Sequence, residues 1–214
     1  MSGYLVDSYS EFEKLVISPP KKYTDYLVSK IKYNDEDLVL QFPKMTISDQ
    51  ITEKNIELEF TNTKGYNKEM YNFLRNLDRF IIKKVEEHSQ AWFEKAIPPD
   101  SLKKMYNGFV KPPQTTENRS TVNFAISQKK TSFFDKKGND IEYSKFERGE
   151  TAECIAQFKY IFYSKDTCFP VWELVSTKLH KRMEKVPAFG FVDDPDDLCE
   201  VESDDEDLKD FKFF

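Results

Sequence analysis

The chain has 214 residues, of which 39% are hydrophobic, 33% charged and 15% aromatic, and its formal net charge at pH 7 is -6. These values predict one globular domain with an attached tail, and no apolar run approaches the ~18 residues of a membrane-spanning helix. Residues 1–10 lack the basic and apolar regions of a secretory signal, so we expect an intracellular protein without membrane contact.

The first part of the chain is predicted to contain an arm followed by strands. Apolar positions in residues 1–22 end in Pro19-Pro20-Lys21-Lys22, a break that separates this expected N-terminal arm from the domain. Apolar runs and alternating patterns then predict strands. These strands lie at the end of residues 23–33, at 38–42, at 45–47 beyond Pro43, and at 55–60.

A helical pattern covers residues 66–93. Apolar side chains recur there at steps of three and four residues, which is the spacing of one buried helix face. They are Met70, Phe73, Leu74, Leu77, Ile81 and Val85. Asn67 is expected to cap the start of this helix, and the apolar stripe is expected to belong to the core rather than to a ligand site.

The rest of the body shows the period-two pattern of strands again. Predicted strands cover residues 106–110, 122–126, 131–135, 141–143, 151–163 and 171–179. Residues 136–139 are predicted to form a hairpin turn in which Gly138 supplies a positive φ. Many strands with one inserted helix predict a mainly β (α+β) fold, either a small barrel or an α+β sheet.

The same alternation assigns faces to individual aromatic residues. In the long strand, Phe158, Tyr160 and Phe162 are expected to be buried together, so that Lys159 and Tyr163 face outward. Phe133 and Phe134 are adjacent and therefore point to opposite faces, so at most one of them can belong to the core.

The charge is divided unevenly along the chain. Residues 193–214 hold eleven acidic residues against Lys209 and Lys212, which leaves the remaining 192 residues with a net charge of +3. A block of like charge stays solvated, so we expect a domain at residues 23–192 and an acidic tail at 193–214. One interpretation is a solubilising appendage. The other is a docking peptide with an aromatic tip, formed by Asp204, Asp205, Glu206, Asp207, Phe211, Phe213 and Phe214.

The sequence contains no recognisable motif for catalysis or cofactor binding, whether a Gly-rich phosphate loop, a nucleophile elbow or a zinc-protease helix. His88 and His180 lie in polar stretches and are expected at the surface. The three cysteines include no C-x-x-C pair, so neither a zinc site nor a disulfide framework is expected. We therefore expect a binding protein that needs no cofactor or metal, not an enzyme.

Basic and aromatic residues interleave on the later strands, in a chain with 19 Phe and 11 Tyr. Single-stranded nucleic acid needs this combination, because phosphates attract cations and unstacked bases pack on flat aromatic rings. The candidate nucleic-acid-binding residues are Lys129, Lys130, Phe133, Phe134, Lys136, Lys137, Lys159 and Tyr163.

Several segments together resemble the single-stranded-DNA-binding proteins of nucleocytoplasmic large DNA viruses, which are similar to phage replication-type binding proteins. The segments are Leu38-Val-Leu-Gln-Phe-Pro-Lys-Met45, the helix, Val122-Asn-Phe-Ala-Ile126, residues 150–163 and Val171-Trp-Glu-Leu-Val175. The resemblance implies an oligonucleotide/oligosaccharide-binding (OB-fold-like) barrel that binds single-stranded DNA without sequence preference.

The resemblance further implies a role in viral DNA replication, recombination or repair. It implies a tail that recruits replication proteins and competes with DNA for the barrel groove, and a location in a cytoplasmic viral factory, the nucleus or the virion. The sequence leaves open whether the ligand is DNA or RNA and whether the chain forms a homo-oligomer.

Two other functions stay open at this point. One is a virion structural or scaffolding protein whose tail is a linear docking peptide. The other is an acidic-tailed chaperone of basic proteins, which would bind histones through the tail and would not depend on Lys129 and Lys130.

Overall fold

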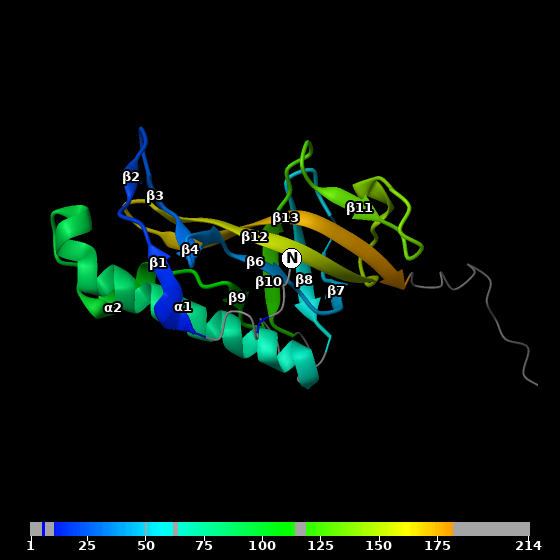
Figure 1. The fold of residues 1–214 in the computed structure, drawn as a ribbon, viewed down its shortest axis with the longest axis horizontal. Helices are drawn as coiled ribbons and strands as arrows, with labels where there is room; N and C mark the ends of the chain where they lie inside the picture. Colours follow the sequence, from blue (N-terminus) through cyan, green and yellow to red (C-terminus); the bar gives the residue numbers. More distant parts are fainter. Residues whose placement is uncertain (1–5, 7–10, 50, 62–63, 114–118, 182–214) are drawn as a thin grey trace, which may run out of the picture. The chain divides into compact units, whose positions relative to one another are not determined.

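The computed structural model describes residue 6 and residues 11–49, 51–61, 64–113 and 119–181 (Figure 1). The internal contacts divide the chain into one unit of Met1–Met183 and another of Glu184–Phe214. The second unit, with Cys199 and every residue of the predicted tail, lies outside the described residues.

Five strand positions close a barrel in the first unit. They are occupied, in chain order, by β6 (Val39–Gln41) with β7 (Met45–Ile47), β8 (Asn55–Phe60), β10 (Thr121–Ala125), β12 (Thr151–Tyr163) and β13 (Cys168–Lys181). Neighbouring strands are antiparallel except β10 and β13, which are parallel, and β12 pairs with both β13 and β6–β7 to close the ring. The predicted OB-fold-like barrel with one long helix is confirmed.

Two helices and several short elements lie around the barrel (Figure 1). They are the helices α1 (Gly65–Phe93) and α2 (Pro99–Met105), the 3-10 turns Phe12–Lys14 and Tyr143–Lys145, and the strands β1 (Leu15–Ile17), β2 (Lys21–Lys22), β3 (Leu27–Ser29), β4 (Ile31–Tyr33), β5 (Glu36–Asp37), β9 (Val110–Lys111) and β11 (Ser132–Phe134). Neither helix of the described chain combines the length and the apolar character needed to cross a membrane.

Helix α1 joins β8 to the later strands and matches the predicted span. All six apolar residues of its predicted stripe are buried. The expectation that Asn67 caps the helix is wrong, because the helix begins at Gly65 and Lys64 holds the cap position. Asn67 instead lies in the first turn, where it is buried and accepts a hydrogen bond from the Thr61 hydroxyl at 3.4 Å.

Two segments differ from the predicted strands. The strand expected at residues 106–110 is reduced to β9 and a single bridge between Tyr106 and Cys168, and it follows the unpredicted helix α2. The final strand of the predicted hairpin is a 3-10 turn from residue 143, although its turn forms as expected with Gly138 at φ 89°.

The long strand β12 contains an extra residue at Lys159. Phe158 is opposite Trp172 and Tyr160 is opposite Val171, so Lys159 has no partner position on β13. This β-bulge reverses the buried face: Phe158 is buried before it, whereas Ile161 and Tyr163 are buried after it. The expectation that Tyr163 faces outward and that Tyr160 and Phe162 are buried with Phe158 is therefore wrong.

Residues 12–22, expected to belong to an arm, are part of the fold. Strand β1 pairs with β4, and β2 pairs with β3 at the edge of the larger sheet. Leu15 and Ile17 are buried, and the Phe12 ring lies 5.4 Å from the Phe73 ring of α1. Pro19 and Pro20 lie in the connection between β1 and β2, which pair with β4 and β3 respectively, so they do not mark the edge of a domain.

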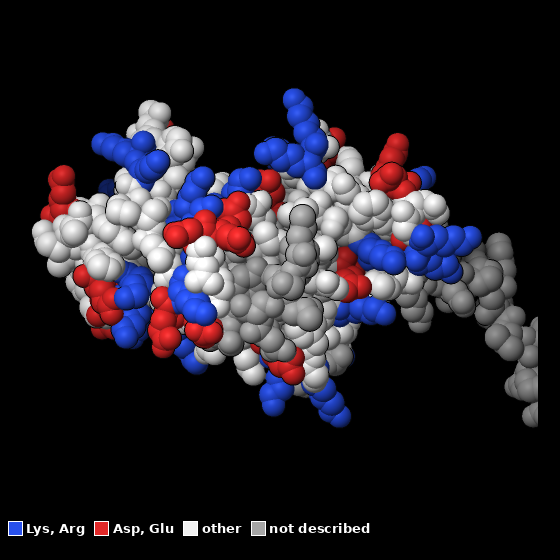
Figure 2. Space-filling model, viewed as in Figure 1, with Lys and Arg blue, Asp and Glu red and all other residues white. Residues whose placement is uncertain are grey.

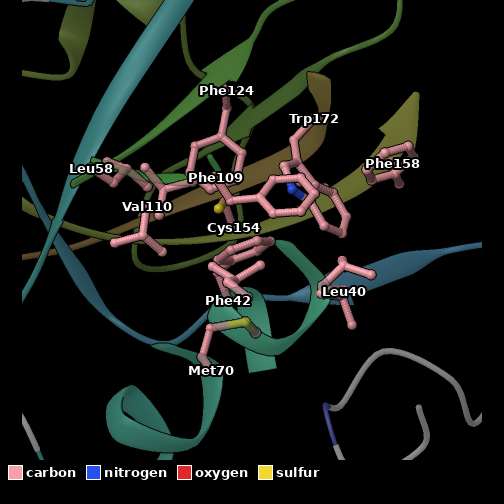
Figure 3. Packing of buried hydrophobic residues seen from close by; sticks show 14 of the residues in the cluster. Leu40, Phe42, Leu58, Met70, Phe109, Val110, Phe124, Cys154, Phe158 and Trp172 are labelled. Atoms are coloured by element: carbon pink, nitrogen blue, oxygen red, sulfur yellow. The ribbon is translucent and has the colours of Figure 1, made fainter. Parts of the chain in front are cut away.

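The barrel core is built around aromatic rings (Figure 3). The Trp172 ring lies within 5.6 Å, centroid to centroid, of the rings of Phe42, Phe109 and Phe158. Figure 3 also shows Met70 of α1 beside Phe42, so the helix closes one side of the same core. Such ring pairs stabilise a core beyond the area that they bury.

A pair of adjacent substitutions tests whether β1 belongs to the folded unit. Leu15→Ala is expected to lower the free energy of unfolding by about 2–5 kcal/mol, because Leu15 is only 4% exposed and its removal leaves a cavity. Val16→Thr, on the 59% exposed neighbour, is expected to change it by less than about 0.5 kcal/mol. Urea denaturation measures both, and equal stabilities of the two variants would restore the arm interpretation.

Candidate nucleic-acid interface

A pocket of about 320 Å³ opens on the outer face of β8 and β10. It is lined by Lys54, Asn55, Asn107, Gly108, Phe109, Lys111, Asn123, Ala125, Phe169, Pro170, Val171 and Trp172. The second and third strands of an OB-type barrel, β8 and β10 here, form the face that binds oligonucleotides in that fold class.

The pocket exists because β10 is paired incompletely along one edge. Near its start, Thr121 and Val122 pair with β9, whereas at its end Ala125 pairs with β13. Asn123 lies between these two pairings and lines the pocket. Two different strands therefore form the walls, and β10 forms part of the floor.

Polar groups of several kinds converge on the pocket. Lys54 is exposed and forms no ion pair with any other described residue. The Lys111 ammonium lies 2.6 Å from a carboxylate oxygen of Glu57. The amides of Asn55, Asn107 and Asn123 supply donors and acceptors, and the Asn107 amide donates to the Thr167 hydroxyl at 2.8 Å.

Aromatic rings complete the lining. Phe109 and Trp172 are buried core residues that reach the pocket from below, and Phe169 is half-buried at the start of β13. The Trp172 indole N–H is enclosed and has no hydrogen-bond partner within the described part of the chain. A buried donor without a partner costs free energy.

Asp78 of α1 fixes the segment that forms one wall. Its Oδ1 accepts hydrogen bonds from the Phe109 backbone N–H at 3.1 Å and from the Tyr106 hydroxyl at 2.8 Å. A Cβ atom on residue 108 would lie 2.6 Å from Asp78 Oδ2, so a larger residue there would force the Asp78 carboxylate to move. Burial raises the pKa of the Asp78 carboxyl from 3.8 to about 6, although both hydrogen bonds act in the opposite direction.

Lys129 and Lys130, two predicted site residues, lie in a turn next to the pocket. The turn is held by hydrogen bonds to the Ser127 carbonyl, and both lysines are exposed. The Ile126 N–H donates to the Lys54 carbonyl at 2.7 Å, which places this turn beside the loop that carries Lys54. Both loops rise above the barrel (Figure 1).

Lys136 and Lys137 are held elsewhere. They lie in the turn after β11, which is organised by Asp135: the Lys137 and Asn139 N–H groups donate to its Oδ1 at 2.7 and 2.9 Å. Strand β11 pairs with Ser176–Lys178 of β13, whereas the pocket contacts residues 169–172. The turn with Lys136 and Lys137 therefore follows a strand that pairs with the later part of β13, not with the part that lines the pocket.

The remaining predicted site residues have mixed outcomes. Of the adjacent pair, Phe133 is buried against Phe146 and Phe134 is half-buried, so only one of them is core. Phe133 is therefore unable to stack on a base. Tyr163 is 4% exposed and packs against Phe93 of α1, so its predicted contact with bases is also wrong. Lys159 is half-buried and paired with Glu173 at 3.0 Å.

The sequence reasoning missed Lys54, Lys111, Asn123 and Phe169, which the barrel brings together from four separate segments. A signal was present in the alternation of β8 and β10, whose outward positions could be listed in advance. The pocket is assembled by the pairing of β10 with β13, and no local sequence pattern indicates which distant strands pair.

Within the described ranges, no three His, Cys, Asp or Glu side chains are grouped to hold a metal ion. Cys154 and Cys168 are buried thiols, and burial raises the pKa of both, that of Cys168 to about 12. Thiols with such pKa values are poor nucleophiles at neutral pH.

These features define the chain as an OB-fold-like barrel with a mixed basic, amide and aromatic pocket on its second and third strands. The chain belongs to a family described as "Family of unknown function (DUF5871)", whose model matches residues 44–193. No match was found among curated proteins.

Solved structures of phage proteins are similar to this chain at low sequence identity, and the one with a TM-score of 0.50 shares its fold. The single-stranded DNA binding protein gp2.5 of bacteriophage T7 is 10% identical, with a TM-score of 0.50 over 71% of this chain and 96% of that one. The single-stranded DNA-binding protein of bacteriophage Enc34, truncated at its C-terminus, is 14% identical, with a TM-score of 0.45 over 80% of this chain and 98% of that one. A further Enc34 structure, with a TM-score of 0.43, is a complex with single-stranded DNA.

The pKa of Asp78 predicts how stability depends on pH. The folded state binds this proton at about pH 6 and the unfolded state only near 3.8, so acidification stabilises the fold through this group. Between about pH 7 and pH 5 the gain is roughly 1 kcal/mol, and Asp78→Asn is expected to lack it. Urea denaturation of both proteins at the two pH values measures the difference. Identical pH dependence in the variant would contradict the assignment.

Proposed function

We propose that this protein binds single-stranded DNA without sequence preference, through the pocket face of β8, β10 and β13. The observation that carries the proposal is the convergence of two lysines, three asparagines and the Phe169 ring on one pocket of about 320 Å³. The fold shared with gp2.5 of bacteriophage T7, a single-stranded DNA binding protein by name, supports it.

Each class of pocket group has a task in this proposal. Lys54 and Lys111 bind phosphates, with Lys129 and Lys130 extending the basic path past the pocket. Phe169 offers a ring face to an unstacked base. The asparagine amides can donate to or accept from any base edge, so they hold a base without selecting one.

The geometry favours a single strand over a duplex. A base can pack on Phe169 only after it leaves its own stack, and in a duplex this requires breaking both stacking and pairing. Sequence is not read in this arrangement, because ring stacking tolerates every base. We propose that the protein covers exposed strands during DNA replication in the compartment where viral DNA is copied.

We further propose that residues 193–214 compete with DNA and recruit replication proteins. Their eleven acidic residues repeat the charge of a phosphate backbone, and Phe211, Phe213 and Phe214 supply aromatic groups. An anionic segment tethered to a body of net charge +3 acts at high effective concentration.

Titration with fluorescent oligo(dT) tests the binding proposal. The unchanged chain is expected to bind, with an affinity that falls steeply as salt rises, because bound phosphates release counterions. Lys54→Ala with Lys111→Ala is expected to weaken binding about ten-fold or more and to flatten the salt dependence by one or two units of slope.

A second pair of lysine substitutions, Lys68→Ala with Lys83→Ala on α1, serves as the charge-matched control and is expected to bind like the unchanged chain. Equal losses in both pairs would show that total charge, not the pocket, determines affinity. A flat response to single- and double-stranded oligonucleotides at low salt would refute the proposed function.

Removal of residues 193–214 is expected to raise the affinity for oligo(dT), most clearly at low salt, because a competing anion is lost. The measurement is the same titration on the full and the shortened chain. A chain shortened by the same stretch but supplied with the tail as a separate peptide provides the control, since only the tethered tail reaches a high local concentration. Equal affinity of the full and shortened chains would contradict the competition.

A further inference from the structure

Four aromatic rings form a continuous stack on the outside of the barrel. Tyr23 and Tyr26 have centroids 5.2 Å apart and planes inclined by 11°. The Tyr26 ring lies 5.2 Å from Phe162 at 28°, and Phe162 lies 4.8 Å from Phe169 at 27°. We refer to Tyr23, Tyr26, Phe162 and Phe169 as the aromatic ladder.

The ladder is fixed by the sheet beneath it. Phe162 and Phe169 are directly opposite each other on β12 and β13, and Val28 of β3 is opposite Phe162. Tyr23 and Tyr26 flank a turn closed by a hydrogen bond from the Tyr23 N–H to the Tyr26 carbonyl at 2.8 Å. The β-bulge at Lys159 turns Phe162 outward, so the ladder depends on it.

The outer half of the ladder is open to solvent. Tyr23 is 50% exposed and Tyr26 is 40% exposed, and both are among the most exposed large apolar side chains of the described chain. If the two rings served only to stabilise the β2–β3 hairpin, burying them would stabilise it more than leaving them exposed. Tyr26 is stacked between Tyr23 and Phe162, so the ring face that a ligand can reach at this end is the outer face of Tyr23.

The inner end of the ladder is part of the pocket, because Phe169 lines it. Cations flank the outer end: Lys21 and Lys22 form β2 and are exposed, with Asp25 as the one carboxylate in the turn between Tyr23 and Tyr26. Figure 2 shows basic side chains on both projections of the upper edge, the β2–β3 hairpin and the loops above β8, with a hollow between them.

We propose that the aromatic ladder continues the path of the bound strand from the pocket to the β2–β3 hairpin, with a base packed on the outer face of Tyr23, which Tyr26 supports from behind, and phosphates near Lys21 and Lys22. This inference rests on the proposed function, because it extends the path of the strand beyond the same pocket. It assigns the hairpin to binding of the additional nucleotides of a long strand, and it makes affinity depend on strand length.

The test compares oligo(dT) of about four and about twelve nucleotides, a span of lengths bound by single OB folds. Tyr23→Leu with Tyr26→Leu removes the rings and keeps apolar side chains. Tyr23→Phe with Tyr26→Phe keeps the rings and removes only the hydroxyls, so it is the matched control. Fluorescence anisotropy of each labelled oligonucleotide gives the affinities, and thermal melting checks the fold.

The leucine pair is expected to bind the short strand like the unchanged chain and the long strand about ten-fold more weakly, the loss typical of stacked bases. The phenylalanine pair is expected to retain full affinity for both. If the leucine pair melts early, Tyr23→Leu alone, at the exposed end, is expected to show a smaller loss of the same kind.

Unchanged binding of the long strand by the leucine variants would overturn the ladder while leaving the pocket intact. A change in oligomeric state on sedimentation, without a change in affinity, would also overturn it and assign the ladder to contact between copies. Lys54→Ala with Lys111→Ala is expected to weaken binding of both the short and the long oligonucleotide, whereas the leucine pair is expected to weaken binding of the long one alone. This difference distinguishes the contribution of the pocket from that of the ladder. Absence of any binding by the unchanged chain overturns both proposals.

Discussion

The extra residue at Lys159 determines which aromatic residues of β12 lie in the core and which lie at the surface. Before it, β12 contributes Phe158 to the rings around Trp172 inside the barrel. After it, the strand has the opposite phase, so Tyr163 packs under the end of α1 and Phe162 faces outward. A regular strand of the same sequence would bury Phe162 and expose Tyr163. The ladder, the contact with α1 and the barrel core all depend on this one irregularity.

The pocket shares its structural parts with the core. Trp172 and Phe109 belong to the ring cluster that fills the barrel, and the same two residues line the pocket. Asp78 connects α1 to the segment of residues 106–109, which forms one wall, through two hydrogen bonds and a close approach to Gly108. A ligand at this face therefore meets groups that are held by packing, and little ordering is required on binding.

Local sequence patterns predicted what local physics determines. The alternation in β8, the apolar stripe of α1 and the turn glycine at 138 each follow from the periods of strand and helix. The predicted orientation of Tyr163 was wrong because the β-bulge adds one residue to the strand, and no sequence pattern indicates where a bulge occurs. Helix α2 was missed because seven residues with one buried leucine give no period to detect.

The sequence predicted the types of residue in the candidate site but only some of their positions. Basic and aromatic residues near single-stranded DNA were expected from composition, and the turn with Lys129 and Lys130 does lie beside the pocket. Lys54, Lys111 and Phe169 come from three segments that only the closed barrel brings together. Sequence proximity instead grouped Lys136 with Lys129, although β11 carries the former toward the other end of β13.

The charges around the pocket bear on how such a site would work. Lys111 is paired with Glu57 at 2.6 Å, and Lys159 is paired with Glu173 at 3.0 Å. A phosphate that binds either lysine replaces an existing carboxylate partner, so the electrostatic gain is an exchange rather than a new attraction. In a body with a net charge of only +3, the aromatic rings must then contribute a larger share of the affinity than in a strongly basic barrel. In the proposed binding mode, the open ladder beside the pocket supplies that share.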